Sequence, residues 1–495
     1  MNTSLRKNEY RTVGELFSGI GVFLPNGVEN LVVTGIEYNS KDVKPGNIFF
    51  AIRGSKVDGA DFISEAVENG AAMVVSERFI PISVPLLECA PVRRILAEVS
   101  GKYYGNPSRE LRVIGVTGTN GKTSVCGMVR SIFEIAGIST AQFGTLGHII
   151  GDEFEETLNT TPESKEIQRL LRKALDYNCK AAVFEVSSHS LVQYRVHNVD
   201  FDIGVFTNLS SEHLDYHRDM EDYFRAKKRL FEYLRDAKKT AIINMGDAYG
   251  RMLAEMDGLD VIGYGDYEGS DIYIKESVLK ADGTKLKIST PHGEMELRFR
   301  MAGRFNAENA LAAVSVAVVS EIPFDKISEG LEQFNPPRGR MQRIDFGQPF
   351  KIYIDYAHTP DALRRLLKSV REFTEGRIII VFGCGGDRDK SKRVPMAEVV
   401  SNLADLAILT SDNPRTEDPE KILDEVESGF RQGFEYSRLS DRKKAIKLAL
   451  KSARKGDTVI IAGKGHENYQ IYCTEKKYFS EVEIIGEFFK TESKI

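Results

Sequence analysis

Residues 112–130 read RVIGVTGTNGKTSVCGMVR, in which an apolar, β-branched run leads into a glycine-rich loop and then into apolar residues at helical spacing. A loop between a strand and a helix directs backbone N–H groups and the positive end of the helix dipole at one point, which suits a polyphosphate. Lys122 adds a cation, and Thr123 adds a hydroxyl for Mg²⁺. We expect the phosphate contacts to come from Gly118, Thr119, Asn120, Gly121, Lys122, Thr123 and Ser124.

This loop departs from the strict P-loop pattern at one position, because Val116 stands where the pattern has glycine. An ordinary glycine-rich connection between a strand and a helix is therefore the alternative interpretation. The β-branched strand before the loop and the helical spacing after it favour a phosphate-binding loop.

The composition is typical of a globular protein with several domains. The chain has 495 residues, of which 28% are charged and 42% hydrophobic, and its net charge is −5. This length suggests about three domains. The sequence has no basic surplus and no apolar run of roughly 18–20 residues, so we expect neither a nucleic-acid partner nor membrane insertion.

The cellular compartment is predicted from the N-terminus and the cysteines. The N-terminal segment MNTSLRKNEYRTVGEL lacks the hydrophobic stretch of a secretory leader. The five cysteines are scattered and form no CxxC pair, which predicts reduced thiols. We therefore expect a cytoplasmic protein.

The order of strand-like and helix-like segments predicts an α/β fold in three regions. Residues 1–109 form a small N-terminal α/β domain, residues 110–336 a central domain with a mainly parallel sheet and the phosphate loop, and residues 337–495 a C-terminal α/β domain. The stretch FNPPRGR, residues 334–340, interrupts the periodicity between the last two. Predicted C-terminal strands end in polar, glycine-containing loops, which should converge on one crevice.

Two strand ends in the central region carry candidate metal ligands. Glu185 ends one predicted strand, and His213 follows the next. Adjacent parallel strands would bring these residues near Thr123, where all three could share Mg²⁺. Histidine is an unusual ligand for so hard an ion, and a Glu185–His213 pair that only caps helices is the alternative.

A series of motifs gives the chain a specific resemblance. In sequence order they are GVTGTNGKTS, EVSSHSLVQYRV, FTNLSSEHLDYH, YFRAKK, GRFNAENALAA, DYAHTPDAL, FGCGGDRDKSKR, SDNPRTEDP and AGKGHENYQ. Together they resemble the Mur ligases, and among these the ligases that add 2,6-diaminopimelate to a UDP-muramoyl dipeptide. The resemblance covers nearly the whole chain and is strongest from Gly115 onward.

The resemblance implies a domain for the UDP end, a central ATPase and a C-terminal Rossmann-like domain for the amino acid. It also implies a CO₂-derived carbamate on Lys227, which would make this cation a metal-binding anion beside Thr123, Glu185 and His213. Without the resemblance, Lys227 is a surface lysine in the basic run RAKKR. The implied catalytic residues are Lys122, Lys227, Glu185 and His213, and the implied ATP contacts beyond the loop are Asn306, Arg340, Asp355 and His358.

The resemblance further implies two sets of substrate contacts. The UDP-muramoyl-dipeptide contacts fall on Tyr38, Ser40, Asn159, Thr160, Thr161, Ser187, Gln193 and Arg195. The diaminopimelate contacts fall on Arg388, Asp412, Asn413, Pro414, Arg415, Gly463 and Glu467.

The chemistry of diaminopimelate supports the second set independently. This amino acid has a second amino-acid head at its far end, so its site needs a cation for the extra carboxylate and an acid for the extra ammonium. Arg415 suits the carboxylate, with Asn413 beside it, and Glu467 suits the ammonium. Lysine lacks the distal carboxylate and would leave Arg415 unpaired. A turn followed by a helix N-cap is the alternative interpretation of DNPRTEDP.

The chain departs from its relatives in a few places that concern the geometry of the loops. Glu212 stands where relatives commonly have aspartate before the metal-binding histidine, and Gln342 where they often have glutamate. Neither change removes a candidate ligand.

The expected function is an ATP-dependent amide ligase of cytoplasmic peptidoglycan precursor synthesis, acting as a monomer on small-molecule substrates. ATP would convert the D-glutamyl γ-carboxylate into an acyl phosphate, which the amine of meso-diaminopimelate attacks, with Mg²⁺ as the metal. The alternatives are an L-lysine-adding Mur ligase, a folylpolyglutamate synthetase-like ligase and a P-loop nucleotide switch.

Overall fold

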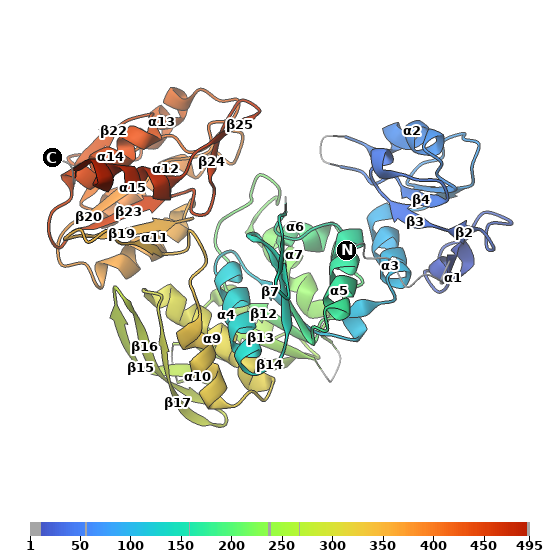
Figure 1. The fold of residues 1–495 in the computed structure, drawn as a ribbon, viewed down its shortest axis with the longest axis horizontal. Helices are drawn as coiled ribbons and strands as arrows, with labels where there is room; N and C mark the ends of the chain where they lie inside the picture. Colours follow the sequence, from blue (N-terminus) through green and yellow to red (C-terminus); the bar gives the residue numbers. More distant parts are fainter. Residues whose placement is uncertain (1–10, 55–56, 158, 236–238, 267, 493–495) are drawn as a thin grey trace.

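The computed structural model describes residues 11–54, 57–157, 159–235, 239–266 and 268–492. Figure 1 shows three bodies in a row: the N-terminal part in blue, the central part in green and yellow, and the C-terminal part in orange and red. Most of the N-terminal segment on which the prediction of no secretory leader depends, residues 1–10, lies outside the described residues.

The N-terminal part is built on a small parallel sheet with the strand order β3-β4-β5-β6. Its elements are β1 Arg11–Thr12, α1 Val13–Phe17, β2 Val32–Val33, β3 Gly35–Glu37, β4 Asn47–Phe50, α2 Ile63–Glu68, β5 Met73–Ser76, β6 Leu86–Glu88 and α3 Val92–Tyr103. The strands β4 and β5 are buried along their whole length, since apolar side chains of this part pack on both of their faces.

The central part is built on a large sheet with the order β10-β9-β8-β11-β7-β12-β13-β14-β15-β16-β17. Its elements are β7 Arg112–Thr117, α4 Lys122–Ile135, β8 Thr140–Gly144, β9 Gly147–Ile150, β10 Glu153–Glu155, α5 Ser164–Asp176, β11 Ala181–Glu185, α6 Ser188–Val192, β12 Ile203–Phe206, α7 Met220–Glu232, β13 Thr240–Asn244, α8 Ala248–Ala254, β14 Asp260–Gly265, β15 Ile272–Lys280, β16 Gly283–Thr290, β17 Gly293–Phe299, α9 Arg304–Val319 and α10 Phe324–Gln333.

Strand β7 runs through the middle of this sheet and leads into the phosphate loop. It pairs in parallel with β11 on one side and β12 on the other. The ends of β11 and β12 therefore flank the loop, instead of lying side by side as predicted from the sequence. Apolar residues of α4, α9 and α10 cover one face of the sheet, and those of α5 and α7 cover the other.

The edge of the central sheet differs from its middle. Strands β15, β16 and β17 pair antiparallel and carry the sheet beyond its parallel part. The alternating burial of β16 and β17, with one face packed and one exposed, is the pattern of an antiparallel edge. No motif or spacing in the sequence predicted this antiparallel extension.

The C-terminal part has the strand order β18-β19-β23-β20-β21-β22, and its inner strands are parallel. Its elements are β18 Gln342–Ile344, β19 Lys351–Asp355, α11 Pro360–Arg371, β20 Ile378–Phe382, α12 Arg393–Leu403, β21 Leu406–Leu409, α13 Pro419–Glu427, β22 Tyr436–Arg438, α14 Arg442–Ser452, β23 Thr458–Ala462, β24 Tyr469–Tyr472, β25 Glu475–Tyr478 and α15 Glu481–Glu492. Helices α11, α12 and α13 cover one face, and α14 and α15 the other.

Local sequence signals fix where several helices near the strand ends begin. Thr359 caps α11 by accepting a hydrogen bond from the backbone N–H of Ala362, and Pro360 occupies the first helical turn. Asp418 and Pro419 start α13 in the same way. A polar cap followed by proline is a favoured helix start, so these loops stop at defined residues.

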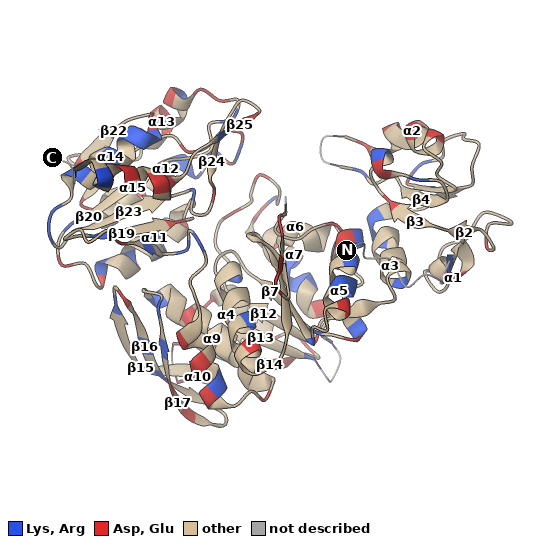
Figure 2. Cartoon of the chain, viewed as in Figure 1, with Lys and Arg blue, Asp and Glu red and all other residues tan. Residues whose placement is uncertain are grey.

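The predicted α/β fold class is confirmed by this architecture and by the structural relatives described below. Among the described residues, no helix combines the length and the apolar character needed to cross a bilayer. In the view of Figure 2, acidic and basic residues alternate over all three parts.

Candidate active site

Two adjoining cavities lie between the central and C-terminal parts. The smaller, of about 220 Å³, is lined by the phosphate loop, and the larger, of about 570 Å³, by C-terminal loops. We call them the loop cavity and the outer cavity. Residues that line both are Glu212, His213, Tyr356 and His358. The two cavities therefore adjoin at these four residues.

The conformation of the phosphate loop requires glycine at two positions. Gly118 has φ +146° and Gly121 φ +92°, in the region that favours glycine. A Cβ on Gly118 would lie 1.9 Å from Thr207 Oγ1, and one on Gly121 would lie 2.3 Å from Asn309 Oδ1. Val116 lies within β7, before this loop begins, so the missing glycine of the strict pattern leaves the turn intact.

The end of β12 braces the phosphate loop. Thr207 Oγ1 donates to the carbonyl of Asn120 at 2.6 Å, and Asn208 Oδ1 accepts from the Asn120 N–H at 3.0 Å. Lys122 Nζ donates to the carbonyls of Gly118 and Thr119 at 2.9 and 2.8 Å. Thr207 and Asn208 therefore fix the loop from outside, and Lys122 folds back onto the loop's own carbonyl groups.

Lys227 lies beneath the same loop, on α7. Its side chain is 2% exposed, and its Nζ donates to the Gly118 carbonyl at 2.8 Å and lies 4.6 Å from the centre of the Tyr223 ring. Burial, and then the nearby charge of Lys122, lowers the pKa of Lys227 well below its ordinary value. Lys227 is therefore no surface lysine, contrary to the interpretation that its basic neighbours suggest.

The other candidate metal ligands face the loop cavity. Thr123, Glu185 and His213 all line it. The carboxylate of Glu185 accepts from the Thr145 N–H at 2.9 Å and from its hydroxyl at 3.0 Å. Desolvation, against the opposing charge of Glu212, lowers the pKa of His213 to about 4, so its imidazole is neutral at pH 7.

This donor set fits a metal that keeps other ligands. Within the part of the chain that the structure describes, no three His, Cys, Asp or Glu side chains are grouped as a metal site. One carboxylate, one imidazole and one hydroxyl leave room for phosphate oxygens, water and a further anion, which is how proteins hold Mg²⁺ beside nucleotides. The alternative direct pair of Glu185 with His213 is not seen, since Glu185 bonds to Thr145 and His213 lies 3.9 Å from Glu212.

The candidate adenosine contacts lie on the C-terminal side of the loop cavity. Asn306, Arg340, Asp355 and His358 all line it. Asp355 accepts the N–H groups of Met341 and Ala357, each at 2.8 Å, and burial raises the pKa of Asp355 despite Arg340 nearby. The carboxylate of Asp355 therefore fixes the backbone at Met341, near the start of the C-terminal part, and also faces the cavity.

Four of the predicted UDP-muramoyl contacts form one hydrogen-bonded group. Thr161 Oγ1 donates to the Glu185 carbonyl at 2.7 Å, and the Ser187 N–H donates to Thr161 Oγ1 at 3.2 Å. Arg195 donates to the Thr161 carbonyl and to Gln193 Oε1, both at 2.8 Å. Thr160 adjoins this group and lines the loop cavity.

The remaining three of these residues are placed differently. Ser40 is 4% exposed and donates to Glu65 Oε2 at 2.5 Å within the N-terminal part. Burial, and then the charges of Glu166 and Glu163, raises the pKa of Tyr38 to about 12, and Arg195 opposes this shift. Asn159 is exposed, and its backbone bonds to Thr157 in a local turn. Ser40 and Asn159 are hydrogen-bonded within their own segments, whereas Tyr38 lies within electrostatic reach of Arg195.

The predicted amino-acid contacts meet around the outer cavity. Arg388, Asp412, Asn413, Arg415, Gly463 and Glu467 line it, whereas Pro414 does not. Arg415 Nη1 donates to the Gly386 carbonyl at 2.6 Å, and its backbone N–H donates to the Ile471 carbonyl at 3.0 Å. Arg415 has φ +53°, and its side chain lines the outer cavity. The DNPR segment therefore does more than form the turn and helix cap of the alternative interpretation.

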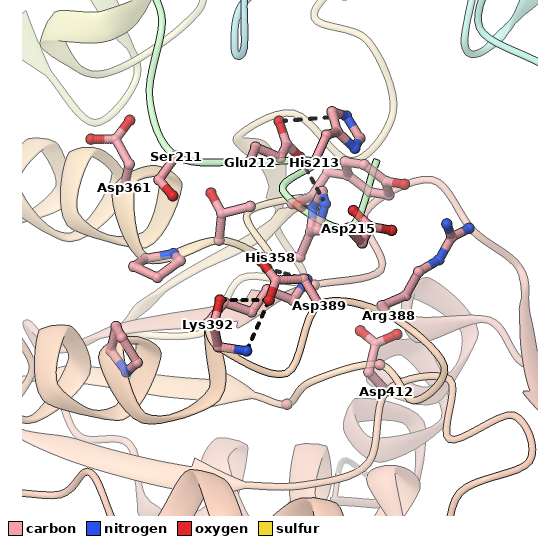
Figure 3. A pocket seen from close by; sticks show the side chains of 18 of the residues that line it. Ser211, Glu212, His213, Asp215, His358, Asp361, Arg388, Asp389, Lys392 and Asp412 are labelled. Carbon is pink, nitrogen blue, oxygen red and sulfur yellow. Dashed lines mark hydrogen bonds and ion pairs between the residues drawn. The ribbon is translucent and has the colours of Figure 1, made fainter. Parts of the chain in front are cut away.

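Figure 3 shows the two sides of the outer cavity, with Glu212 and His213 above and Arg388 and Asp412 below. His358 Nδ1 donates to the Tyr356 carbonyl at 2.7 Å, and its Nε2 lies 3.4 Å from Glu212 Oε1. Desolvation opposes ionisation of Glu212, but His358, His213 and Lys122 outweigh it and hold the pKa of Glu212 well below its usual range. Glu212 thus joins the central and C-terminal parts.

Sequence reasoning missed several residues of the site. Thr207 and Asn208 brace the loop, Asn309 faces Gly121, and Lys464 lies buried behind the outer cavity. A signal existed for the first pair, because they end a predicted strand next to the loop. Asn309 and Lys464 stand within the quoted motifs GRFNAENALAA and AGKGHENYQ, but only the folded chain shows what their side chains contact.

Comparison with known proteins agrees with this geometry. Three family descriptions match: "Mur ligase family, catalytic domain" at residues 32–99, "Mur ligase middle domain" at 116–317 and "Mur ligase, glutamate ligase domain" at 339–465. A UDP-N-acetylmuramoyl-L-alanyl-D-glutamate–2,6-diaminopimelate ligase of Bacillus velezensis is 42% identical over 459 residues, which cover 92% of this chain and 94% of that protein. The chain belongs to the Mur ligase family.

Solved structures place this Mur ligase among its relatives. A structure of a UDP-N-acetylmuramoyl-L-alanyl-D-glutamate–2,6-diaminopimelate ligase matches with a TM-score of 0.71 and 30% identity, over 98% of this chain and 100% of that one. A folylpolyglutamate synthase of Mycobacterium tuberculosis matches with a TM-score of 0.62 and 18% identity, over 74% of this chain. The second likeness concerns the fold alone.

Proposed function

We propose that this Mur ligase joins the amino group of meso-2,6-diaminopimelate to the D-glutamyl γ-carboxylate of UDP-N-acetylmuramoyl-L-alanyl-D-glutamate, with hydrolysis of ATP to ADP and phosphate. The observation that carries the proposal is the junction of the two cavities, where a phosphate loop opens toward Arg388, Arg415 and Glu467. The names of the relatives described above support the choice of substrates.

The chemistry follows from the poor electrophilicity of a carboxylate. A carboxylate oxygen attacks the γ-phosphorus of ATP, ADP leaves, and an acyl phosphate forms. The amine then attacks the acyl carbon, phosphate leaves, and the amine loses a proton. Lys122 must leave the carbonyls of Gly118 and Thr119 to meet the transferring phosphoryl group.

We assign the metal to Thr123, Glu185, His213 and a carbamate on Lys227. Mg²⁺ bound there would supply charge compensation for the phosphoryl group. Burial of Lys227 against the Gly118 carbonyl places its Nζ next to the loop, where an anion could contact the same ion. Residues 1–109 would hold the UDP end, 110–336 the ATP and 337–495 the amino acid.

Each residue group has one task in this proposal. Thr161, Ser187, Gln193 and Arg195, with Tyr38, Ser40, Asn159 and Thr160, would bind the UDP-muramoyl dipeptide. Asn306, Arg340, Asp355 and His358 would contact adenosine. Arg388, Arg415 and Asn413 would bind the distal carboxylate of diaminopimelate, with Glu467 on its ammonium.

Phosphate release with purified protein tests the proposal. Phosphate should be released rapidly only when ATP, the UDP-muramoyl dipeptide and an amino acid are all present. Meso-diaminopimelate, L-lysine and D-lysine are compared as the amino acid, and meso-diaminopimelate should be used best. ATP hydrolysis at the same rate without the dipeptide and the amino acid would indicate a nucleotide switch, and preference for L-lysine would indicate the lysine-adding ligase.

A further inference from the structure

Lys464 is a buried lysine behind the outer cavity. It follows β23 in the GKGHE loop, and its side chain is 0% exposed. Its Nζ donates to Asn413 Oδ1 at 3.0 Å and to Glu467 Oε2 at 2.9 Å, and lies 5.5 Å from the centre of the Tyr469 ring. A charge so deeply buried requires such partners. Lys464 does not line the cavity and acts through the two residues that do.

The hydrogen bonds of this group have only one possible direction. An ammonium only donates and a carboxylate only accepts, and the Asn413 amide lies between them. Asn413 Oδ1 accepts from Lys464 and from the Ile471 N–H, at 3.0 Å each, and Nδ2 donates to Glu467 Oε2 at 2.9 Å. The amide oxygen is fully used, so Asn413 can offer a ligand only its second N–H. That group suits a carboxylate and not an ammonium.

Lys464 also changes the charge that a ligand meets. Both contacts to Glu467 fall on Oε2, and the internal ammonium of Lys464 compensates the charge of this carboxylate. Burial opposes ionisation of Asp412, but Lys464 and Arg442 outweigh it and lower the pKa of Asp412. Lys464 therefore adds a buried positive charge next to Asp412 and Glu467, in a cavity wall that also holds Arg388 and Arg415.

We propose that Lys464 is a specificity-determining positioning residue: it locks Asn413 as a donor and neutralises Glu467, so that the site selects the distal carboxylate of the amino acid ahead of its distal ammonium. This inference rests on the proposed function. It specifies that, of the two distal groups of the amino acid, the carboxylate contributes more to selection. Without Lys464, the charge of Glu467 would be uncompensated. It would then attract an amino acid that carries a distal ammonium but no distal carboxylate more strongly than it does when paired.

The first test uses the unmodified enzyme and three amino acids. Meso-diaminopimelate has both distal groups, 2-aminopimelate lacks the distal amine, and L-lysine lacks the distal carboxylate. We expect kcat/KM to fall from diaminopimelate to 2-aminopimelate to lysine. Lysine used as well as or better than 2-aminopimelate would overturn the inference. Failure to use diaminopimelate at all would instead overturn the proposed function.

The second test changes Lys464. Lys464→Met removes the charge and both hydrogen bonds, and should raise the KM for diaminopimelate by roughly tenfold and shift the ratio of lysine to 2-aminopimelate use by roughly tenfold toward lysine. The KM for ATP should stay the same, which a general loss of structure would not allow. Lys464→Gln, which keeps a donor without the charge, should shift the same ratio and serves if the Met variant does not fold.

A matched control lies on the neighbouring hairpin. Lys476 Nζ lies 4.4 Å from the centre of the same Tyr469 ring but belongs to the exposed strand β25. Lys476→Met should leave all three amino acids ranked as in the unmodified enzyme. The inference is overturned if both Lys464 variants keep the unmodified ratio of lysine to 2-aminopimelate.

Discussion

The phosphate loop and the C-terminal loops that face it are held in different ways. Around the phosphate loop, side chains donate to backbone carbonyls: Lys122 and Lys227 to Gly118, and Thr207 to Asn120. In the C-terminal loops, Arg415 also donates to a backbone carbonyl, but charged side chains additionally hold one another, as Lys464 holds Asn413 and Glu467. The phosphate loop is thus held mainly through its backbone carbonyls, and the C-terminal loops depend more on bonds between charged side chains.

This difference matches what each region has to recognise. A triphosphate is the same in every ATP-using enzyme, and backbone N–H groups around glycines are enough to bind it. An amino acid must be distinguished from similar ones, which requires particular side chains that can change while the strands stay in place. The first region should therefore affect the rate of all reactions, and the second the choice of substrate.

The largest expected effect is that of Lys227→Ala. If a carbamate on Lys227 holds a metal at the phosphate loop, its loss should lower kcat by about a thousandfold with every amino acid. Lys228→Ala, the next residue on α7, is the matched control and should be nearly as active as the unmodified enzyme. Steady-state phosphate release measures both.

The carbamate itself can be detected apart from activity. Protein incubated with ¹³C-bicarbonate should show a carbamate carbon signal by NMR that Lys228→Ala keeps and Lys227→Ala loses. Full activity of Lys227→Ala, or the same signal in both variants, would contradict the assignment.

Arg415→Ala should have a smaller and more selective effect. It removes the cation proposed to pair with the distal carboxylate, so the KM for diaminopimelate should rise by roughly a hundredfold. The KM for ATP should change little, because Arg415 lines only the outer cavity. Arg371→Ala, at the exposed end of α11, is the control. An unchanged preference for diaminopimelate over lysine would refute the role of Arg415.

The same comparison explains what the sequence could predict. The phosphate loop is contiguous in sequence, and its glycines, Lys122 and Thr123 could be recognised directly. The α/β fold class followed from the alternation of apolar strands and helices, and it is confirmed. The domain boundaries and the roles of individual site residues stay predictions.

What escaped prediction depends on contacts between distant segments. Lys464 and Asn413 are 51 residues apart and meet only when β21 and β23 lie in the same sheet. The motif AGKGHENYQ marks the loop, but its letters do not show that Lys464 is buried where Gly463 and Glu467 face the cavity. The burial of Lys227 was hidden in the same way by its basic neighbours.

The smallest expected effect concerns acid, to which the two regions should respond differently. Glu417 holds the C-terminal loops by accepting from the Asp387 N–H at 2.7 Å and from the buried Arg393 at 3.0 Å. Burial opposes ionisation of Glu417, but these bonds and Lys390 lower its pKa to about 2. The stabilisation is therefore complete above the unfolded value of about 4.3 and is lost as the pH falls from there toward 2.

Hydrogen exchange of the peptide around Glu417 measures this stabilisation. Glu417→Gln should destabilise this segment by about 2 kcal/mol at pH 6. The difference from the unmodified protein should shrink at pH 3, because the carboxylate of the unfolded segment is then protonated and unfolding takes up a proton. The exchange of residues 118–123 should not differ between the two proteins, since the bonds of Glu417 go to Asp387, Lys390 and Arg393 in the C-terminal loops. Glu88→Gln, at an exposed position on β6, is the control. A difference that stays constant from pH 6 to pH 3 would mean that shape, and not charge, holds these loops.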